Sequence, residues 1–126
     1  MNTPKKCISA AAVLAIVTCY AIGASAHSFP ESETPSAGQT IAAAPSEVII
    51  NFDAPIEKLF AKLEVIGADG KNDANGAAQV SDDGRRLSVK LGALKPGDYT
   101  VKWTVVCIDT HHTEGSYTFS IASGGS

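Results

Sequence analysis

Apolar residues at every second position are the feature of this sequence that most limits how the chain can fold. Val101, Trp103, Val105 and Cys107 share one parity of residues 99–108, and the other parity is mostly polar. This alternation places the apolar side chains on one face of an extended strand, whereas an amphipathic helix needs a repeat of about 3.6 residues. Residues 99–108 are therefore predicted to form a long strand with one buried face.

Shorter segments along the chain also have the composition of strands, and residues typical of turns separate them. They cover residues 46–52, 60–66, 78–80, 86–91 and 115–121. About five to seven short strands at regular spacing are typical of a β-sandwich or barrel, so an all-β fold is predicted. The residues expected in its core are Val48, Ile50, Leu87, Trp103, Val105 and Phe119.

Two segments have a less regular pattern. Residues 27–44 contain proline and glycine with serine and threonine between them, so an extended arm and loop is expected there. Residues 58–66 could also be read as helical. The β-branched pair Val65-Ile66 and the short length favour a strand, with Phe60 as its first apolar member.

The first 26 residues have the order of a secretory signal peptide. Lys5 and Lys6 precede a charge-free apolar stretch over residues 8–24, and Ala24-Ser25-Ala26 forms a small-residue cleavage site. The stretch is just long enough to span a bilayer, so a membrane anchor is the alternative. The cleavage site and the lack of a stop-transfer pattern favour a signal peptide that is cleaved after Ala26. The residues before Cys19 match a lipidation signal poorly.

Cleavage after Ala26 leaves residues 27–126, which is 126 − 26 = 100 residues. That length suits one domain with a modest core, expected over residues 27–122, with a disordered tail at residues 123–126. Loss of two lysines changes the formal charge from −3 to −5, with 8 basic against 13 acidic residues. An acidic domain without a basic patch is not expected to bind nucleic acid. Export to the periplasm as a soluble protein is predicted.

Three cysteines become one when the signal peptide is removed. Cys107 then has no partner in its own chain, so the fold is expected to rest on its core without a disulfide. Cys107 shares the parity of Trp103 and is predicted to be a buried, inert thiol, with a role as a soft metal ligand as the alternative.

Histidine occurs at only three positions, and these suggest a metal site. The α-amine and Nδ1 of an N-terminal His27 can close a six-membered chelate ring on one ion. An α-amine has a pKa close to ~8 and so releases its proton to a metal more readily than a lysine does. With the imidazole of His111 and the carboxylate of Asp109, the donors form an N₃O set. Such a set suits one Cu(II) ion, which it binds more tightly than zinc.

The spacing of Asp109 and His111 supports this prediction. Side chains two apart on a strand point the same way, so both could bind one ion. The strand is expected to end or bulge near Ile108, because perfect alternation would bury Asp109. The alternative is an ordinary polar turn with a solvated His111. His112 is expected to be a solvated surface residue in either case.

Three stretches of the mature chain resemble the CopC family of periplasmic copper-binding proteins. The first is His27 at the signal junction followed by residues 33–38, and the second is residues 48–52. The third runs from residues 97–103 through Asp109-Thr110-His111 to residues 115–119. The ordered combination of a terminal His, a Y-x-V-x-W strand, D-x-H and G-x-Y-x-F is specific, and it spans nearly all of residues 27–121.

This resemblance implies an immunoglobulin-like or cupredoxin-like Greek-key β-sandwich of about seven strands, with Cu(II) bound by His27, Asp109 and His111. It implies a monomeric protein that buffers or carries copper for homeostasis, resistance or uptake, and that is not an enzyme. A CopD-like inner-membrane copper transporter is the partner that the family suggests. Some members carry a Met-rich Cu(I) site, but Met1 is the only methionine here and leaves with the signal peptide.

Two other functions are compatible with parts of the sequence. Copper held by a terminal histidine resembles the histidine brace of copper-dependent polysaccharide monooxygenases. Those enzymes need an open coordination position, whereas Asp109 would occupy one and add negative charge. A metal-free adhesion or scaffold domain would explain the sandwich but not the coincidence of His27 with the cleavage site.

Overall fold

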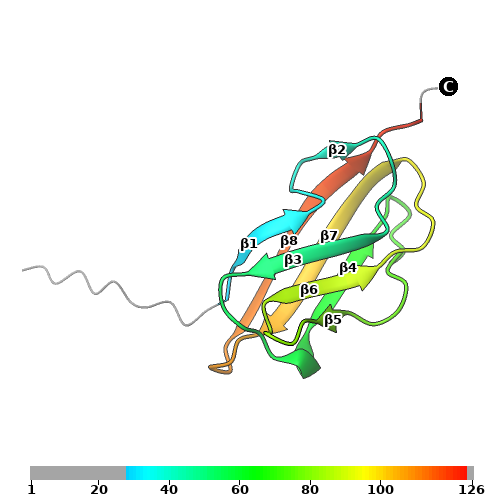
Figure 1. Ribbon diagram of the computed structural model, residues 1–126. Coiled ribbons are helices and arrows are strands. Elements are labelled where there is room, and N and C mark those ends of the chain that lie inside the picture. The colour runs from blue at the N-terminus through cyan, green and yellow to red at the C-terminus, as the bar shows by residue number, and fades with distance from the viewer. Residues whose placement is uncertain (1–27, 125–126) are drawn as a thin grey trace, which may run out of the picture.

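Two four-stranded sheets make up the fold in the computed structural model, which describes residues 28–124 (Figure 1). The first sheet has the strand order β1-β3-β6-β5 and the second has the order β2-β8-β7-β4. The strands are β1 (Pro30–Thr34), β2 (Thr40–Ile41), β3 (Glu47–Phe52), β4 (Lys62–Ile66), β5 (Gln79–Val80), β6 (Arg86–Lys90), β7 (Gly97–Val106) and β8 (His112–Ile121). A short 3₁₀ helix, η1 (Lys58–Phe60), precedes β4.

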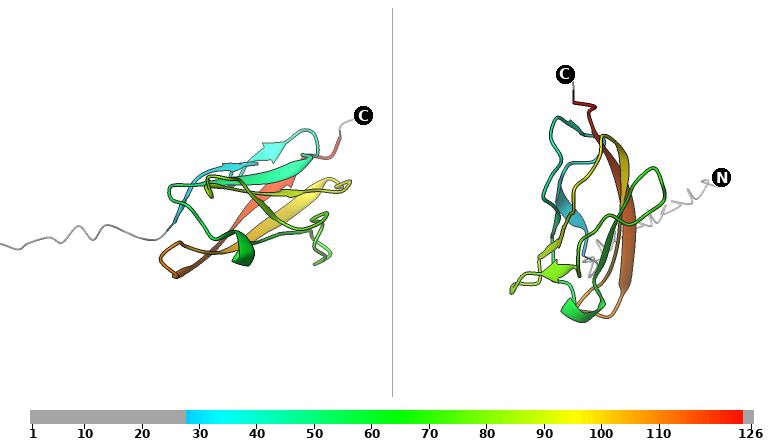
Figure 2. Two further views of the ribbon diagram at one scale, coloured as in Figure 1. Left: turned by 60° about the horizontal axis from the view of Figure 1, so that its bottom comes forward. Right: turned by 90° about the vertical axis from the view of Figure 1, so that its right-hand side faces the viewer.

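The two sheets pack face to face, as the views in Figure 2 show. Neighbouring strands are antiparallel except β2, which runs parallel to the end of β8. The long hairpin of β7 and β8 pairs ten residues from each strand and forms the centre of the second sheet. The predicted all-β sandwich is therefore confirmed.

The core lies between the sheets and contains the apolar parity of each strand. Phe52 from the first sheet packs edge-on against Trp103 from the second, with ring centroids 5.4 Å apart. Tyr99 and Phe119 stack within the second sheet at 5.5 Å. The six residues predicted for the core are all buried: Val48, Ile50, Leu87, Trp103, Val105 and Phe119.

Residues 27–44 were expected to be arm and loop, but within this range the structure has strands β1 and β2. β1 pairs with β3 along the edge of the first sheet, and its side chains are mostly exposed. β2 has only two residues. An edge strand of this kind is held by backbone hydrogen bonds and needs no apolar alternation. The composition of the segment therefore gave no sign of it.

The expected strand over residues 60–66 was also partly wrong. Phe60 lies in η1 with its side chain 63% exposed, and β4 begins only at Lys62. Among the other apolar residues expected in this strand, Leu63 and Val65 are buried and Ile66 is half-buried. The helical alternative for residues 58–66 therefore holds for one short turn and the strand for the rest.

The expected signal peptide over residues 1–26, His27 and the last two residues of the expected tail lie outside the described part of the chain. Within residues 28–124, no helix is long and apolar enough to cross a bilayer.

Candidate metal centre

The turn between β7 and β8 carries the two internal residues of the predicted metal site. β7 ends at Val106, so the regular strand stops before Ile108, as expected. The backbone of Cys107 closes the turn with two hydrogen bonds. Its N–H donates to the carbonyl of His111 at 2.8 Å, and its carbonyl accepts from the N–H of Thr110 at 2.9 Å. Asp109 is consequently free of the strand alternation that would have buried it.

Asp109 and His111 contact each other directly within this turn. Nδ1 of His111 lies 2.9 Å from Oδ2 of Asp109, and the backbone N–H of His111 donates to Oδ1 at 3.2 Å. The His111 side chain is 63% exposed and that of Asp109 is 29% exposed. The two side chains meet because the turn brings residues 109 and 111 together. They do not lie side by side on a strand, which was the geometry expected from their spacing.

Thr110 adopts a backbone conformation that is rare for a β-branched residue, with φ at 76°. This left-handed conformation reverses the chain between Asp109 and His111 and costs conformational energy outside glycine and asparagine. The strained residue therefore lies between the two predicted metal ligands and helps to determine how their side chains meet.

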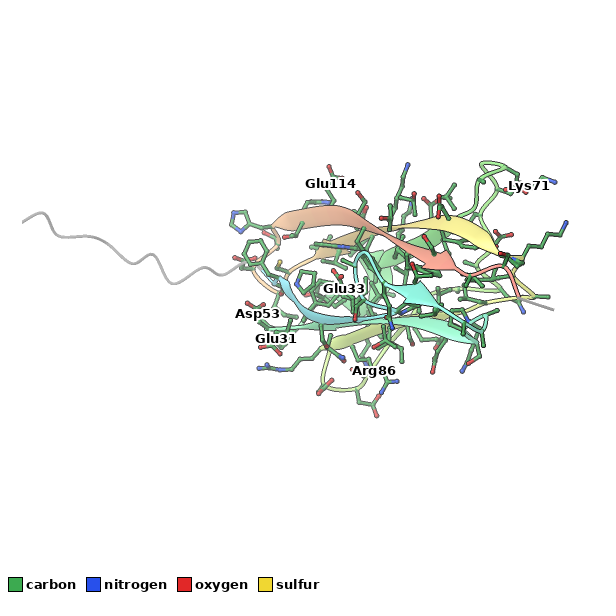
Figure 3. All side chains as sticks on the ribbon, turned by 90° about the horizontal axis from the view of Figure 1, so that it is seen from above. Glu31, Glu33, Asp53, Lys71, Arg86 and Glu114 are labelled. Atoms are coloured by element: carbon green, nitrogen blue, oxygen red, sulfur yellow. The ribbon has the colours of Figure 1, made fainter. Side chains whose placement is uncertain are left out.

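The first described residues are anchored beside the same turn. The N–H of Ser28 donates to Sγ of Cys107 at 3.0 Å, and its hydroxyl donates to the carbonyl of Pro55 at 3.1 Å. The N–H of Phe29 donates to Oδ1 of Asp53 at 2.7 Å, and the N–H of Asp53 donates to the carbonyl of Phe29 at 2.9 Å. Figure 3 shows Asp53 at the end of the sandwich where the described chain begins, with Lys71 at the opposite end.

Cys107 is fully buried, as the sequence predicted. Its sulfur lies 3.4 Å from the hydroxyl of Thr113 as well as accepting from Ser28. Burial raises the pKa of the Cys107 thiol, but the hydrogen bonds with Ser28 and Thr113 outweigh it, so this pKa lies below its ordinary value. The thiol is thus part of the packing between the start of the described chain and the β7–β8 turn.

His112 begins β8 and pairs across the hairpin with Val106. Its side chain is exposed, as expected for a surface histidine. Within residues 28–124, the side chains of His, Cys, Asp and Glu do not gather in groups of three or more that could hold a metal. Of the three predicted ligands, the described residues therefore bring together Asp109 and His111. His27, the third, lies outside this range.

The sequence and structure of this chain can be compared with those of known proteins. Residues 30–122 match the family model of the CopC domain. The chain belongs to the CopC domain family. This CopC chain is 37% identical over 112 residues to Protein YobA of Escherichia coli, covering 86% of this chain and 90% of YobA. It is 31% identical over 114 residues to Copper resistance protein C of Escherichia coli, covering 84% of this chain and 90% of that protein.

A longer relative and two solved structures extend the comparison. Copper transport protein CutJ of Bacillus subtilis is 30% identical over 104 residues, which cover 79% of this CopC chain but only 19% of CutJ. The crystal structure of CopC from Methylosinus trichosporium OB3b superposes with a TM-score of 0.73 at 30% identity, covering 79% of this chain and 98% of that one. PcoC of Escherichia coli, described as a methionine-rich copper resistance protein, gives 0.64 at 25% identity, covering 75% and 98%. These likenesses confirm the predicted fold and family.

Sequence reasoning did not find the anchoring contacts of Ser28, Phe29 and Asp53 in this CopC chain. Ser28 and Cys107 are 79 residues apart in the sequence, and a hydrogen bond to a thiol leaves no composition or spacing signal. The available sign was the position of Ser28 as the second residue after the expected cleavage site.

Proposed function

We propose that this protein binds one Cu(II) ion per chain through His27, Asp109 and His111, and that it buffers or carries copper in the periplasm. The observation that supports this most is the contact of Asp109 with His111 at the end of the sandwich where Ser28 is anchored. Family relatives named for copper resistance and copper transport support a role in copper handling. The fold alone would not give this role, because one fold serves many functions.

The distance between the two internal donors fits binding of one ion. Nitrogen and oxygen ligands lie ~2.0–2.1 Å from a first-row ion such as zinc. Two such donors at a right angle, as in a tetragonal site, would be about 2.9 Å apart. Nδ1 of His111 and Oδ2 of Asp109 are 2.9 Å apart. Once the shared proton has left, one ion placed to the side of the line between the two atoms could bind both, after the imidazole turns toward it.

The remaining two donors of the proposed set come from His27. The nitrogen of Ser28 is bonded to the carbonyl carbon of residue 27, and neighbouring Cα atoms are about 3.8 Å apart. Because this nitrogen is 3.0 Å from Sγ of Cys107, which precedes Asp109 by two residues, we infer that His27 can reach the β7–β8 turn. Signal cleavage after Ala26 would free the α-amine, which can then complete the chelate with the imidazole of His27.

The donor set favours Cu(II) over Cu(I). Imidazole, amine and carboxylate suit Cu(II), whereas Cu(I) prefers thioether and thiolate ligands. Met1 is the only methionine of the chain, and Cys107 is fully buried with its sulfur in hydrogen bonds. PcoC is described as methionine-rich, whereas this chain would have no methionine thioether to offer Cu(I) once Met1 leaves with the signal peptide.

Carriage rather than catalysis is the activity that we propose. His111 is 63% exposed on the turn, so an ion there would be accessible to an acceptor protein. A CopD-like membrane transporter is the proposed partner. In CutJ the matching segment is 19% of a longer copper transport protein, which supports coupling of this domain to a transport step.

Titration of the mature protein with Cu(II), followed by electron paramagnetic resonance, tests the proposal. We expect saturation at one ion per chain and a tetragonal spectrum with hyperfine structure from three nitrogens. Saturation at a different stoichiometry, or a spectrum with a single nitrogen, would contradict it. The His112→Ala variant is the control, because His112 is exposed at the start of β8 and is not in the proposed set.

A further inference from the structure

We propose that Cys107 and Asp53 are positioning residues that hold the start of the mature chain so that His27 meets Asp109 and His111. We call Ser28, Phe29, Asp53 and Cys107 the arm clamp. This inference rests on the proposed function, since the clamp acts on a copper site that includes the terminal histidine. Neither Cys107 nor Asp53 is a copper ligand in this account.

The clamp holds the backbone of two consecutive residues from two sides. The Ser28 N–H donates to Cys107 Sγ at 3.0 Å, and the Phe29 N–H donates to Oδ1 of Asp53 at 2.7 Å. Asp53 also donates its own N–H to the carbonyl of Phe29 at 2.9 Å. The side chain of Ser28 is completely buried and donates to the carbonyl of Pro55. Residue 28 therefore has a fixed position before any ion is bound.

Cys107 connects this arm to the metal-ligating turn. Its sulfur accepts from Ser28, and its backbone N–H donates to the carbonyl of His111 at 2.8 Å. The second contact of the sulfur, to Thr113 Oγ1 at 3.4 Å, comes from β8 on the far side of the turn. One buried residue thus contacts the arm, the turn and the following strand, so the arm and the turn are positioned relative to each other.

Fixing the arm matters because a chain terminus is otherwise mobile. The first residues of a domain are poorly ordered unless they are tied down. A chelate that includes a mobile terminus loses part of its affinity to the cost of ordering that terminus, and pre-organisation removes this cost. One hydrogen bond contributes modestly to stability, so its loss should weaken copper binding by about two- to tenfold.

The first test measures the clamp without copper. In the mature protein that begins at His27, heteronuclear NMR follows solvent exchange of the Ser28 amide. We expect exchange about two- to tenfold faster in Cys107→Val than in the wild type, because valine has no acceptor. Cys107→Ser keeps a lone pair and should restore much of the protection. Equal exchange in the wild type and Cys107→Val would overturn the clamp.

The second test measures how the clamp affects the terminal donor. Cu(II) affinity is compared between proteins that begin at His27 and proteins with one glycine in front of it, in the wild type and in Cys107→Val. A purely structural loss would weaken both forms equally. The clamp predicts that the ratio of the two affinities falls by about two- to tenfold in Cys107→Val and recovers in Cys107→Ser.

Asp53→Ala keeps the test usable if Cys107→Val does not fold. Asp53 is exposed, so its removal leaves the core intact, and the affinity ratio should fall in the same way. Asp82→Ala is the matched control, because Asp82 is also exposed and pairs with Lys58 instead of the arm. An affinity ratio equal to that of the wild type in both Asp53→Ala and Cys107→Val, or in Asp53→Ala alone where Cys107→Val does not fold, would overturn the clamp. Equal affinity of the two wild-type forms would instead overturn the proposed function.

Discussion

The imidazole of His111 lies against the carboxylate of Asp109, with Nδ1 2.9 Å from Oδ2, in a turn closed by the backbone of Cys107. This contact holds the imidazole in one orientation. A carboxylate in this position can serve as a direct ligand after the shared proton leaves, or can orient the imidazole from outside the coordination sphere. The two roles predict different effects of replacing Asp109.

Substitution of the proposed ligands should weaken Cu(II) binding, whereas substitution of the neighbouring His112 should not. His111→Ala removes a nitrogen donor and should reduce affinity by more than about 100-fold, because even outer-sphere partners typically contribute about 10- to 100-fold. If the carboxylate binds the ion, Asp109→Ala and Asp109→Asn should both lose Cu(II) affinity, and to a similar extent. His112→Ala should match the wild type. Competition with a coloured Cu(II) chelator measures all four. An Asp109→Asn variant with wild-type affinity would exclude a direct role for the carboxylate.

Gly115 is required by its neighbour Trp103 across the β7–β8 hairpin. A Cβ atom at position 115 would lie 2.5 Å from Cζ2 and 2.8 Å from Cε2 of the indole. Overpacking of this kind typically costs about 1–3 kcal/mol, so Gly115→Ala should lower the free energy of unfolding by that amount. Gly92→Ala is the control, since nothing lies within 4 Å of its Cβ. Urea denaturation measures both variants, and equal stability would show that Trp103 can move aside.

Relief of backbone strain at Thr110 should stabilise the protein. Its φ of 76° is in the left-handed region, which asparagine adopts more readily than a β-branched residue. Thr110→Asn should therefore raise the free energy of unfolding by up to about 1 kcal/mol. Thr118→Asn is the matched control, because Thr118 is exposed within β8 and asparagine is unfavourable in strands. Thermal unfolding measures the variants. A lower midpoint temperature for Thr110→Asn than for the wild type would contradict the prediction that Thr110 is strained.

Two buried tyrosines should respond oppositely to loss of the hydroxyl. Tyr117 Oη is buried without a hydrogen-bond partner among residues 28–124, whereas Tyr99 Oη donates to the carbonyl of Lys95 at 2.6 Å. Tyr117→Phe should be neutral or stabilising by up to about 1 kcal/mol, and Tyr99→Phe should cost about that amount. Urea denaturation at neutral pH measures the free energy of unfolding of both variants. A clear loss of stability in Tyr117→Phe would reveal a partner for its hydroxyl.

Tyr117 also gives a pH dependence with a defined sign. Burial, and then the charge of Glu33, raises the pKa of Tyr117 well above its ordinary value. The unfolded chain therefore loses this proton more readily than the folded one. The contribution to stability is complete below the ordinary pKa of ~10 and is lost as the pH rises above it. Stability curves at alkaline pH should fall less steeply for Tyr117→Phe than for the wild type.

The sequence predicted those parts of the fold in which burial imposes a period. The apolar parity of residues 99–108 and of β3 gave the strands and the core residues correctly, because each of these strands buries one face. β1 was missed because its side chains are mostly exposed and its backbone hydrogen bonds carry no pattern. Phe60 was wrongly assigned to the strand because residue type alone does not distinguish an exposed phenylalanine in a short helix from a buried one in a strand.

The candidate site could be predicted only in part. The proximity of Asp109 and His111 was expected, but the reason was wrong, because they meet in a turn with a strained Thr110. The anchoring of Ser28 by Cys107 joins residues that are distant in the sequence, and local patterns do not report such contacts. The role of His27 stays a prediction, since it depends on where the signal peptide is cleaved.

The most direct measurement of the central claim compares the protein that begins at His27 with a form carrying one glycine before it. A free α-amine donates a nitrogen after losing one mildly basic proton, whereas an amide nitrogen gives up its proton far less readily. Competition titration with a coloured Cu(II) chelator at neutral pH gives both affinities. We predict much tighter binding by the form that begins at His27. Equal affinities would show that the terminal amine is not a ligand and would contradict the account.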